Sequence, residues 1–503
     1  MASRKSTYLT KTRYVNGLAC AKWLWLDFNA PDKLPKPDPS AQFLLDQGRR
    51  VGELARARYP GGELIAPAGP TENDRRSREL LERRAPLFEA GFIHPDRSCY
   101  ARADVLVPVG RDRWDVVEVK SAGGVKEEHP HDVAFQRYCY SAAGLKIRQC
   151  HLLHINTKYE RRGEVDPAQL FQEVDITGAV NEITPTVGPH IADLLQVANA
   201  RDCPEFGRGE PFHKDEAGVH TDDTVWKEHP GSDILGLYHA GKRALEFLEA
   251  GVYRISDIPK SVSLKGNQAI QHAAHLTGRI HVDRAEVAAF LAKLRYPLYF
   301  LDFETFGTAV PLCDRARPYQ QIPFEFSIHV VKAPNGDPKH YSFISLEAED
   351  PRSGLLDSLR KAIGPAGHVV AYNQGFEKAI LTDLATFLPE HSEWVEEVSR
   401  RFVDLMAPFR SFAYYSPAQG GSASLKAVLP AVTGRGYEGF EIANGGQASL
   451  AYLHSVFGQF DGKRAAPFEV EETRKALERY CGRDTEGMVR IVEKLTELTS
   501  LAG

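Results

Sequence analysis

The chain has 503 residues, more than one hydrophobic core usually accommodates, which argues against a single domain and predicts at least two. A hydrophobic content of 43% beside 26% charged residues argues against a disordered chain. The formal net charge of −5 excludes a uniformly basic nucleic-acid-binding protein, so any affinity for phosphate must come from local patches or bound cations.

The N-terminal region alternates patterns of helix and strand. Apolar periodicity predicts a helix over residues 41–59, and strand patterns follow at 103–107, 114–120 and 150–156. Together these elements indicate an α/β domain over residues 1–200. Arginines are concentrated in its first half, where they form either a phosphate-contacting surface or the solvated faces of helices. They are Arg49, Arg50, Arg56, Arg58, Arg75, Arg76, Arg78, Arg83 and Arg84.

The rest of the chain divides into a connector and a second α/β region. Residues 201–295 have a mostly helical pattern with polar breaks and are predicted to be a helical connector. Residues 296–503 begin with a strongly apolar strand at 297–305 and end with a long helical pattern at 473–495. The chain shows no internal repeat, so the two α/β regions are not copies of each other.

The first candidate site lies on two neighbouring strands. Glu118 and Lys120 are two residues apart, so their side chains point to one face, and Asp104 joins them if the strands form a hairpin. Two carboxylates can hold Mg²⁺ while the lysine lies beside the attacking water or the scissile phosphate. Gln136 and Tyr140 share one face of the next helix and approach the carboxylates if that helix packs on the sheet. Alternating charges on a solvent-exposed strand are the alternative interpretation.

These residues resemble the RecB-like branch of the PD-(D/E)XK nucleases, which share an Asp, a Glu-x-Lys and a following Gln-x-x-x-Tyr. The resemblance covers residues 9–175 and implies a restriction-endonuclease-like fold in which Asp104, Glu118 and Lys120 are catalytic. It also implies Asp104 and Glu118 as metal ligands. In that family an acidic residue or histidine on an earlier helix often completes the metal shell, and Glu53 is the matching candidate here.

The seven cysteines are scattered, without the spacing of a zinc site or a secreted disulfide framework, which predicts reduced thiols. With no apolar stretch long enough to cross a bilayer, a cytoplasmic location is expected. Many RecB-like nucleases hold an iron–sulfur cluster through one early cysteine and three later ones. Cys20 matches the early position, but the expected later run does not appear, because residues 201–226 contain only Cys203, so the cluster is predicted to be absent. A zinc site formed by Cys20, Cys203, His213 and His220 is the alternative.

The second candidate site begins on the apolar strand at 297–305. Asp302 and Glu304 lie on the same face at the end of that strand, where the cost of two buried carboxylates predicts a bound cation or protonation. Glu377 follows a later strand, and Tyr480 and Asp484 are one helical turn apart in the terminal helix. Four acids brought together would bind two divalent ions, and Tyr480 would orient the attacking water.

This ordered set resembles the DnaQ-like DEDD exonucleases of the ribonuclease H-like superfold, in the version whose last motif is Tyr-x-x-x-Asp. The resemblance covers residues 296–498 and implies Asp302, Glu304, Glu377 and Asp484 as metal ligands. It departs at one position, because the family usually has Asp after Asn-x-x-Phe and this chain has Glu377. Asp404 is a possible substitute ligand.

Residues 317–330 and 422–430 also resemble segments of an uncharacterised bacterial family that fuses these two nuclease-like parts. The resemblances together imply a Mg²⁺- or Mn²⁺-dependent nuclease that hydrolyses phosphodiester bonds, with DNA expected as the substrate and RNA as the alternative. Repair, recombination or defence would suit such a protein, and no membrane contact is expected. The other hypothesis is a nucleic-acid-binding or scaffolding protein with one or both sites inactive, motivated by Glu377 and the missing cluster cysteines.

Overall fold

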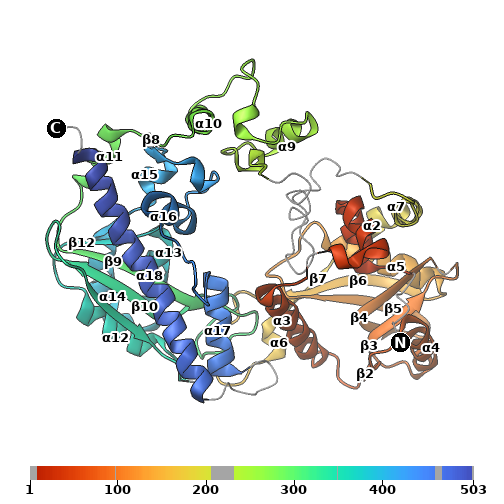
Figure 1. Cartoon of the computed structure of the whole chain (residues 1–503). Coiled ribbons are helices and arrows are strands. Elements are labelled where there is room, and N and C mark those ends of the chain that lie inside the picture. The colour runs from red at the N-terminus through yellow and green to blue at the C-terminus, as the bar shows by residue number, and fades with distance from the viewer. Residues whose placement is uncertain are drawn as a thin grey trace. The chain divides into compact units, whose positions relative to one another are not determined.

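The protein is a mixed α/β protein that divides into two compact units. The computed structural model describes residues 8–34, 36–96, 98–204, 231–347, 349–458 and 467–500 (Figure 1). The first unit comprises residues 1–228 and 308–319, and the second comprises residues 229–307 and 320–503. Residues 231–295 of the predicted connector therefore group with the second unit.

The first unit is built on a seven-stranded sheet. Its main path is β2 (Glu63–Leu64), β3 (Leu87–Ile93), β4 (Cys99–Val109), β5 (Arg113–Lys120), β6 (Lys146–Ile155) and β7 (Phe171–Asp175), with β1 (Leu9–Thr10) beside β4. Strands β3, β4 and β5 form an antiparallel meander, and β5 pairs in parallel with β6. A parallel pair needs a crossover connection. Helix α5 (His129–Ala142) supplies it and carries the predicted Gln-Tyr pair.

Helices cover this sheet through two apolar clusters. One cluster contains residues of α1 (Lys11–Ala19), α2 (Ala21–Asn29), α5 and α7 (Thr177–Ala198). The other contains residues of α3 (Pro39–Arg56), the predicted helix at 41–59. Trp114 and Val116 of β5 belong to the first cluster and Val117 to the second. Because side chains alternate along a strand, Glu118 continues the face that α1 and α5 cover.

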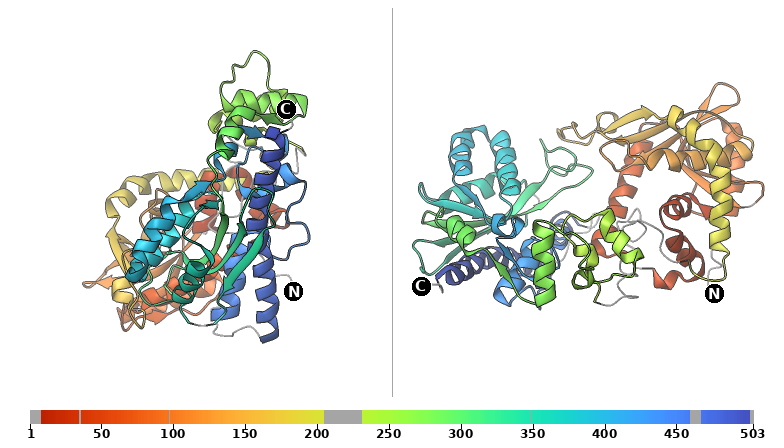
Figure 2. Two further views of the ribbon diagram at one scale, coloured as in Figure 1. Left: turned by 90° about the vertical axis from the view of Figure 1, so that its left-hand side faces the viewer. Right: turned by 90° about the horizontal axis from the view of Figure 1, so that it is seen from above.

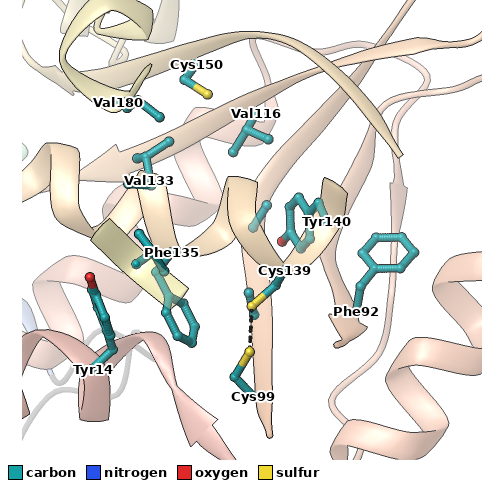
Figure 3. Close-up of a cluster of buried hydrophobic side chains, with 14 of the residues drawn as sticks. Tyr14, Phe92, Cys99, Val116, Val133, Phe135, Cys139, Tyr140, Cys150 and Val180 are labelled. Atoms are coloured by element: carbon teal, nitrogen blue, oxygen red, sulfur yellow. Dashed lines mark hydrogen bonds between the residues drawn. The ribbon is translucent and has the colours of Figure 1, made fainter. Parts of the chain in front are cut away.

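Helix α5 is held against the sheet by aromatic and thiol contacts (Figure 3). Phe135 stacks on Tyr14 of α1 with ring centroids 4.9 Å apart, and Tyr140 meets Phe92 of β3 edge to face at 5.2 Å. The Cys139 thiol lies 3.2 Å from that of Cys99 on β4. These contacts bury the helix and determine which of its residues face the end of β5.

Residues 308–319 form a loop that follows the strand Leu298–Phe306 of the second unit and folds as part of the first unit. The Ala309 N–H donates to Gln47 Oε1 of α3 at 2.6 Å, and Ala309 is buried in the apolar cluster of that helix. Arg161 exchanges backbone hydrogen bonds with Arg315 and Ala316. No periodic pattern marks such a loop, because its contacts are non-local.

The second unit is built on a five-stranded sheet in the order β11 (Lys339–Ile344), β10 (Ile322–Val331), β9 (Leu298–Phe306), β12 (His368–Ala371) and β13 (Phe402–Asp404). Strand β10 runs antiparallel to both neighbours, whereas β9, β12 and β13 are mutually parallel. The predicted strand at 297–305 is thus the central one. A separate two-stranded sheet joins β8 (His281–Val282) to β14 (Tyr414–Tyr415).

Two apolar clusters also lie on the two faces of this sheet. Helices α12 (Arg352–Ala362), α13 (Gly375–Phe387) and α14 (Ser392–Arg400) contribute to one. Helices α11 (Arg284–Leu291), α16 (Leu425–Thr433) and the long α18 (Pro467–Ser500) contribute to the other, and α18 runs along the sheet (Figures 1 and 2). Leu298 and Phe300 face the α18 side, so alternation places Asp302 and Glu304 there as well.

The remaining described helices of the second unit include α9 (Lys242–Glu249), α10 (Asn267–Thr277), α15 (Ala407–Arg410) and α17 (Gly445–Phe457). The first two, like α11, lie in the stretch predicted to be a helical connector. Among the described residues of both units, no helix has the length and apolar character that crossing a bilayer requires.

Candidate active sites

The predicted triplet of the first unit converges at the end of β5. The Glu118 side chain is 1% exposed, and Lys120 Nζ lies 3.1 Å from its Oε1 atom. Asp104, on β4, accepts the Val119 N–H at 2.7 Å through Oδ2 and is close enough for the charge of Glu118 to shift its pKa. Asp104, Glu118 and Lys120 form a compact charged group, here called the β5 cluster.

Two further charged residues join the β5 cluster and were missed by sequence reasoning. Lys11, in the first turn of α1, contacts Glu118, and Asp132 of α5 lies 2.5 Å from Lys120 Nζ. The sequence could have indicated Asp132, because this residue precedes Gln136 by one helical turn and therefore lies on the same helix face. No sequence pattern indicates Lys11, because its helix reaches the cluster through tertiary packing.

Burial and charge act differently on the two carboxyl groups of the β5 cluster. Burial, reinforced by the negative charge of Glu118, raises the pKa of Asp104 to about 7. Burial also opposes the ionisation of Glu118, but attraction by Lys11 and Lys120 outweighs it and lowers the pKa to about 2. Glu118 is thus ionised at neutral pH, and a bound cation would favour the ionised form of Asp104 as well.

The structure brings Gln136 to the β5 cluster but directs the Tyr140 hydroxyl elsewhere. Gln136 Nε2 donates to Glu118 Oε2 at 2.7 Å and to the Arg102 carbonyl at 3.1 Å. The Tyr140 hydroxyl donates to the Ala90 carbonyl at 3.1 Å within the apolar core. Gln136 therefore positions the carboxylate, and Tyr140 has a packing role in this arrangement.

Glu53 is not placed in the β5 cluster. Val51 and Ala55 form the buried face of α3, and Glu53 lies on the opposite face because it is about 200° around the helix from Val51. Its side chain is 55% exposed and pairs with Arg50 at 3.3 Å. The charge of Glu89, in addition to that of Glu118, acts on Asp104. Glu89 lies on strand β3, whereas the additional acid was expected on a helix.

The clustered arginines of the first unit are engaged by neighbouring groups. Arg49, Arg50, Arg75, Arg76 and Arg78 pair with acids of their own helices. The other four contact acids or backbone carbonyls of neighbouring elements: Arg56, Arg58, Arg83 and Arg84. These contacts favour the interpretation as solvated and locally paired faces.

The cysteine prediction falls partly on described residues. Cys20 is buried and caps α2, where its sulfur accepts the Trp23 N–H at 3.2 Å. Cys203 is half-buried. His213 and His220 lie outside the described residues, so the alternative zinc site stays a prediction.

The four predicted acids of the second unit also converge. Asp302 and Glu304 end β9, Glu377 lies in the first turn of α13, and Asp484 lies on α18. Ligand atoms of Asp302, Glu304 and Cys481 lie within 4.8 Å of one another. A cavity of about 440 Å³ is lined by Asp302, Glu304, Asp484 and Tyr480, among others. The four acids are here called the β9 cluster.

Burial, with repulsion between neighbouring carboxylates, dominates the electrostatics of the β9 cluster. Burial raises the pKa of Asp302 well above its usual range, and the charges of Asp484, Glu304 and Glu377 add to the shift. Burial, with the charge of Asp484, raises the pKa of Glu304 to about 8. Burial raises the pKa of Glu377 to about 8 and that of Asp484 to about 6. A divalent cation bound among these carboxylates would therefore offset the repulsion between their ionised forms.

The donor set fits hard divalent cations. The carboxylates supply the oxygen ligands that Mg²⁺ and Mn²⁺ prefer. Among the described residues, buried Glu377 Oε2 has no hydrogen-bond partner, so this atom has capacity for a ligand. Cys481 suits such ions poorly, because burial raises the pKa of its thiol well above the usual range. Its Sγ lies 3.8 Å from Asp302 Oδ2, where the neutral thiol can donate.

Asp484 is held by two tyrosines, of which only Tyr480 is predicted from the sequence. Burial raises the pKa of Asp484, whereas hydrogen bonds from Tyr437 and Tyr480 lower it, as does the charge of Lys426. Tyr437 lies on a segment without a recognisable motif, and the resemblance of residues 422–430 assigns no role to Lys426. Lys426 and Arg483 are cations whose charges act on Asp484, and Lys426 also feels Glu304 and Asp302, so it would attract a phosphate there.

Glu377, rather than Asp404, acts on the rest of the β9 cluster. Asp404 Oδ1 accepts the N–H groups of Asn373 at 3.1 Å and Met406 at 3.0 Å, and Oδ2 lies 3.3 Å from Arg410. Its oxygens therefore hold the local chain. Glu377 is 2% exposed, and its charge contributes to the pKa shift of Asp302.

Comparisons connect parts of the chain to known proteins. Residues 299–424 match a family described as a domain of unknown function, DUF2779. The chain is also similar to the "Uncharacterized protein MG366 homolog" of Mycoplasma pneumoniae (strain ATCC 29342 / M129 / Subtype 1), with 25% identity over 218 residues, 40% of this chain and 32% of that protein. The match spans about a third of that relative's length. No solved structure matches the chain.

When no metal is present, we expect the free energy of unfolding of the second unit to fall as pH rises from about 4 to about 8. Glu304 and Glu377 have ordinary pKa values of 4.5, which the fold raises to about 8. The folded state therefore binds more protons than the unfolded state within this window, and the free energy of unfolding falls as pH rises. Saturating Mn²⁺ should reduce this fall. Melting temperatures measured across the window with EDTA or Mn²⁺ test this, and equal slopes would contradict it.

Proposed function

We propose that the protein is a Mg²⁺- or Mn²⁺-dependent nuclease that hydrolyses phosphodiester bonds, with DNA as the expected substrate. The observation that carries this proposal is the convergence of the β9 cluster, four acids from three separate elements, at the end of the central strand. Buried acids that repel one another oppose folding, so their assembly is best explained by a cation-dependent role. The β5 cluster is the second nuclease-type site of the proposal.

The sheet of the second unit supports a ribonuclease H-like domain. Its first strand, β9, is central, with β10 and β11 on one side, β12 and β13 on the other, and β10 antiparallel to its neighbours. This arrangement agrees with the fold that the DEDD resemblance implies. The first unit has an antiparallel meander followed by a crossover helix and a parallel strand, which agrees with the PD-(D/E)XK resemblance.

In the second unit, the proposed mechanism assigns distinct tasks to the acids and their neighbours. Asp302, Glu304, Glu377 and Asp484 would hold two divalent ions, which supply a water of lowered pKa and stabilise the leaving oxygen. Tyr480 would orient the attacking water. Tyr437 keeps Asp484 in position by a hydrogen bond, and Lys426 adds positive charge where an anionic strand must approach.

In the first unit, Asp104 and Glu118 would hold the cation, and Lys120 would lie beside the attacking water or the scissile phosphate. Gln136 holds one Glu118 oxygen at 2.7 Å and so orients the carboxylate. One observation favours the alternative binding role for this unit. Glu118 is already neutralised by Lys11 and Lys120, so the site depends less on a cation than the β9 cluster does.

The proposal is tested by incubating the purified protein with labelled single- and double-stranded DNA and RNA in Mg²⁺, Mn²⁺ or EDTA. Cleavage is expected with either cation and not with EDTA. Lys120→Ala and Asp302→Ala, tested separately, assign each cutting activity to one unit. Binding of nucleic acid without cleavage under any of these conditions would overturn the nuclease proposal and favour the scaffolding hypothesis.

A further inference from the structure

The Cys481 thiol lies among the acids of the β9 cluster, although the hard cations of the proposed mechanism have little use for a sulfur ligand. Its Sγ atom and a carboxylate oxygen from each of Asp302 and Glu304 all lie within 4.8 Å of one another. In the part of the chain that the structure describes, this is the only group of three metal-ligating side chains that are so close. Its chemistry therefore differs from that of four carboxylates.

The spacing of these atoms suits a tetrahedral ion that has a thiolate ligand. Zn²⁺ lies about 2.3 Å from a thiolate sulfur and about 2.0–2.2 Å from a carboxylate oxygen, so a sulfur and an oxygen bound to one ion are about 3.6 Å apart. Cys481 Sγ lies 3.8 Å from Asp302 Oδ2. The two atoms are thus already near the separation that shared coordination requires.

A fifth acid, Glu325 of β10, lies at this group with its carboxyl oxygens unsatisfied. Glu325 is the direct partner of Glu304 in the antiparallel β9–β10 pair, so the two side chains lie on the same face of the sheet. Glu325 is 0% exposed, and no described group forms a hydrogen bond with either of its carboxyl oxygens. A buried carboxyl group without a partner costs free energy, which a nearby cation would offset.

Helix α18 brings the thiol to the same side of the sheet as Glu325. Thr485 follows Cys481 by one helical turn and shares a hydrogen bond of 2.7 Å with Ser327 Oγ. Ser327 is two residues after Glu325 on β10 and therefore lies on the same face of the strand. After burial, the charge of Glu325 contributes most to the raised pKa of the Cys481 thiol. The thiol and the unpartnered acid therefore face a common space.

A cation reaches this group through the cavity of about 440 Å³ at the β9 cluster. Asp302 and Glu304 line that cavity. Cys481 is 0% exposed, as Glu325 is, and neither belongs to the cavity lining. An entering ion therefore meets the two carboxylates first, and the thiol and Glu325 lie behind them.

We propose that Cys481, Asp302 and Glu304 form a binding site for a thiophilic divalent cation, typified by Zn²⁺, to which Glu325 adds negative charge. Binding breaks the S–H bond and forms a metal–sulfur bond, and the proton leaves to solvent. The thiophilic ion uses Asp302 and Glu304, so it excludes the hard cations and inhibits cleavage. This competition rests on the proposed nuclease function, whereas the binding itself does not.

The test is a titration of the metal-free, full-length protein with cadmium chloride, followed by the ultraviolet charge-transfer absorption of the cadmium–thiolate bond. Cys481→Ser is expected to abolish this absorption. It should also weaken Cd²⁺ binding at least about tenfold, because the loss of even a supporting group around a metal costs about 10–100-fold in affinity. The matched control is Cys203→Ser, which removes a half-buried cysteine of the first unit and should retain the absorption.

A second variant and a second ion distinguish ligation from a structural effect. Glu325→Gln keeps the shape of the side chain and removes its charge, so Cd²⁺ should bind several-fold more weakly while the absorption at saturation remains. Mn²⁺ affinity is measured by electron paramagnetic resonance on the same proteins. In Cys481→Ser the ratio of Cd²⁺ affinity to Mn²⁺ affinity should fall at least about tenfold, because a thiolate favours the softer ion.

The inference is overturned if the wild type shows no cadmium–thiolate absorption, if the absorption persists in Cys481→Ser, or if this variant loses affinity for Cd²⁺ and Mn²⁺ equally. Inhibition of Mg²⁺-dependent cleavage by Zn²⁺ is measured separately, and Cys481→Ser should need at least about ten times more Zn²⁺ for half-inhibition. Absorption that depends on Cys481 without any cleavage would retain the thiophilic site and overturn the nuclease proposal. Cleavage without the absorption would do the reverse.

Discussion

Replacing Asp302 by asparagine is expected to lower the metal-dependent cleavage by the second unit at least about 10³-fold, because cation-mediated charge stabilisation contributes several kcal/mol to such reactions. The same change should stabilise the metal-free protein at neutral pH by about 1–2 kcal/mol. The reason is that burial and four neighbouring acids raise the pKa of Asp302, so the folded state must keep a proton that the unfolded state releases. Asparagine removes this cost.

Single-turnover cleavage and thermal unfolding of the same preparation measure both effects. The stability gain should be larger at pH 8 than at about pH 3, which is below the ordinary pKa of 3.8, so that the carboxyl group is mostly protonated in both states. Asp357→Asn is the matched control, because Asp357 is 62% exposed on α12. Loss of activity together with loss of stability would show instead that Asp302 supports the fold.

Replacing Glu118 by alanine is expected to destabilise the first unit by about 3–5 kcal/mol, the cost of removing one partner from a buried ion pair. Lys11 and Lys120 both contact this carboxylate and would be left facing each other without an acid between them. The pKa of Glu118 is lowered to about 2, so its contribution is complete above the ordinary value of 4.5 and is lost as pH falls toward 2.

Urea unfolding of Glu118→Ala and Glu118→Gln at neutral pH tests this expectation. The glutamine variant should lose less stability, because its amide can still hydrogen-bond to Gln136 and Lys120. Adding Lys11→Met to Glu118→Gln should recover part of the loss, since it removes one unpaired ammonium group. A Glu118→Ala variant as stable as the wild type would contradict a buried ion pair at this position.

The sequence was sufficient to predict the elements whose patterns are local. The strands that carry Asp104, Glu118 and Asp302 appear as apolar alternations, and spacing along a strand or helix places Glu118 with Lys120 and Tyr480 with Asp484. The convergence of the β9 cluster was predicted by the ordered resemblance, since no local pattern relates residues that far apart in the chain.

The residues that could not be predicted reach their sites through tertiary packing. Lys11 meets Glu118 from a helix 107 positions earlier, and Tyr437 reaches Asp484 from a segment without a periodic pattern. Glu53 illustrates the converse error: its position in the chain suited a metal ligand, but the buried face of α3 is set by Val51 and Ala55 and turns Glu53 to solvent. Which face of a helix is buried depends on partners that the sequence does not specify locally.

The loop at residues 308–319 has a consequence for dissecting the protein genetically. The first unit includes this loop, although the loop follows the central strand of the second unit in the chain. No single truncation point therefore separates two complete units. A fragment ending before residue 229 would lack Ala309 and the partners of Arg161 and would expose the apolar surface they cover. Point substitutions that change one cluster at a time are therefore the sounder way to separate the two proposed activities.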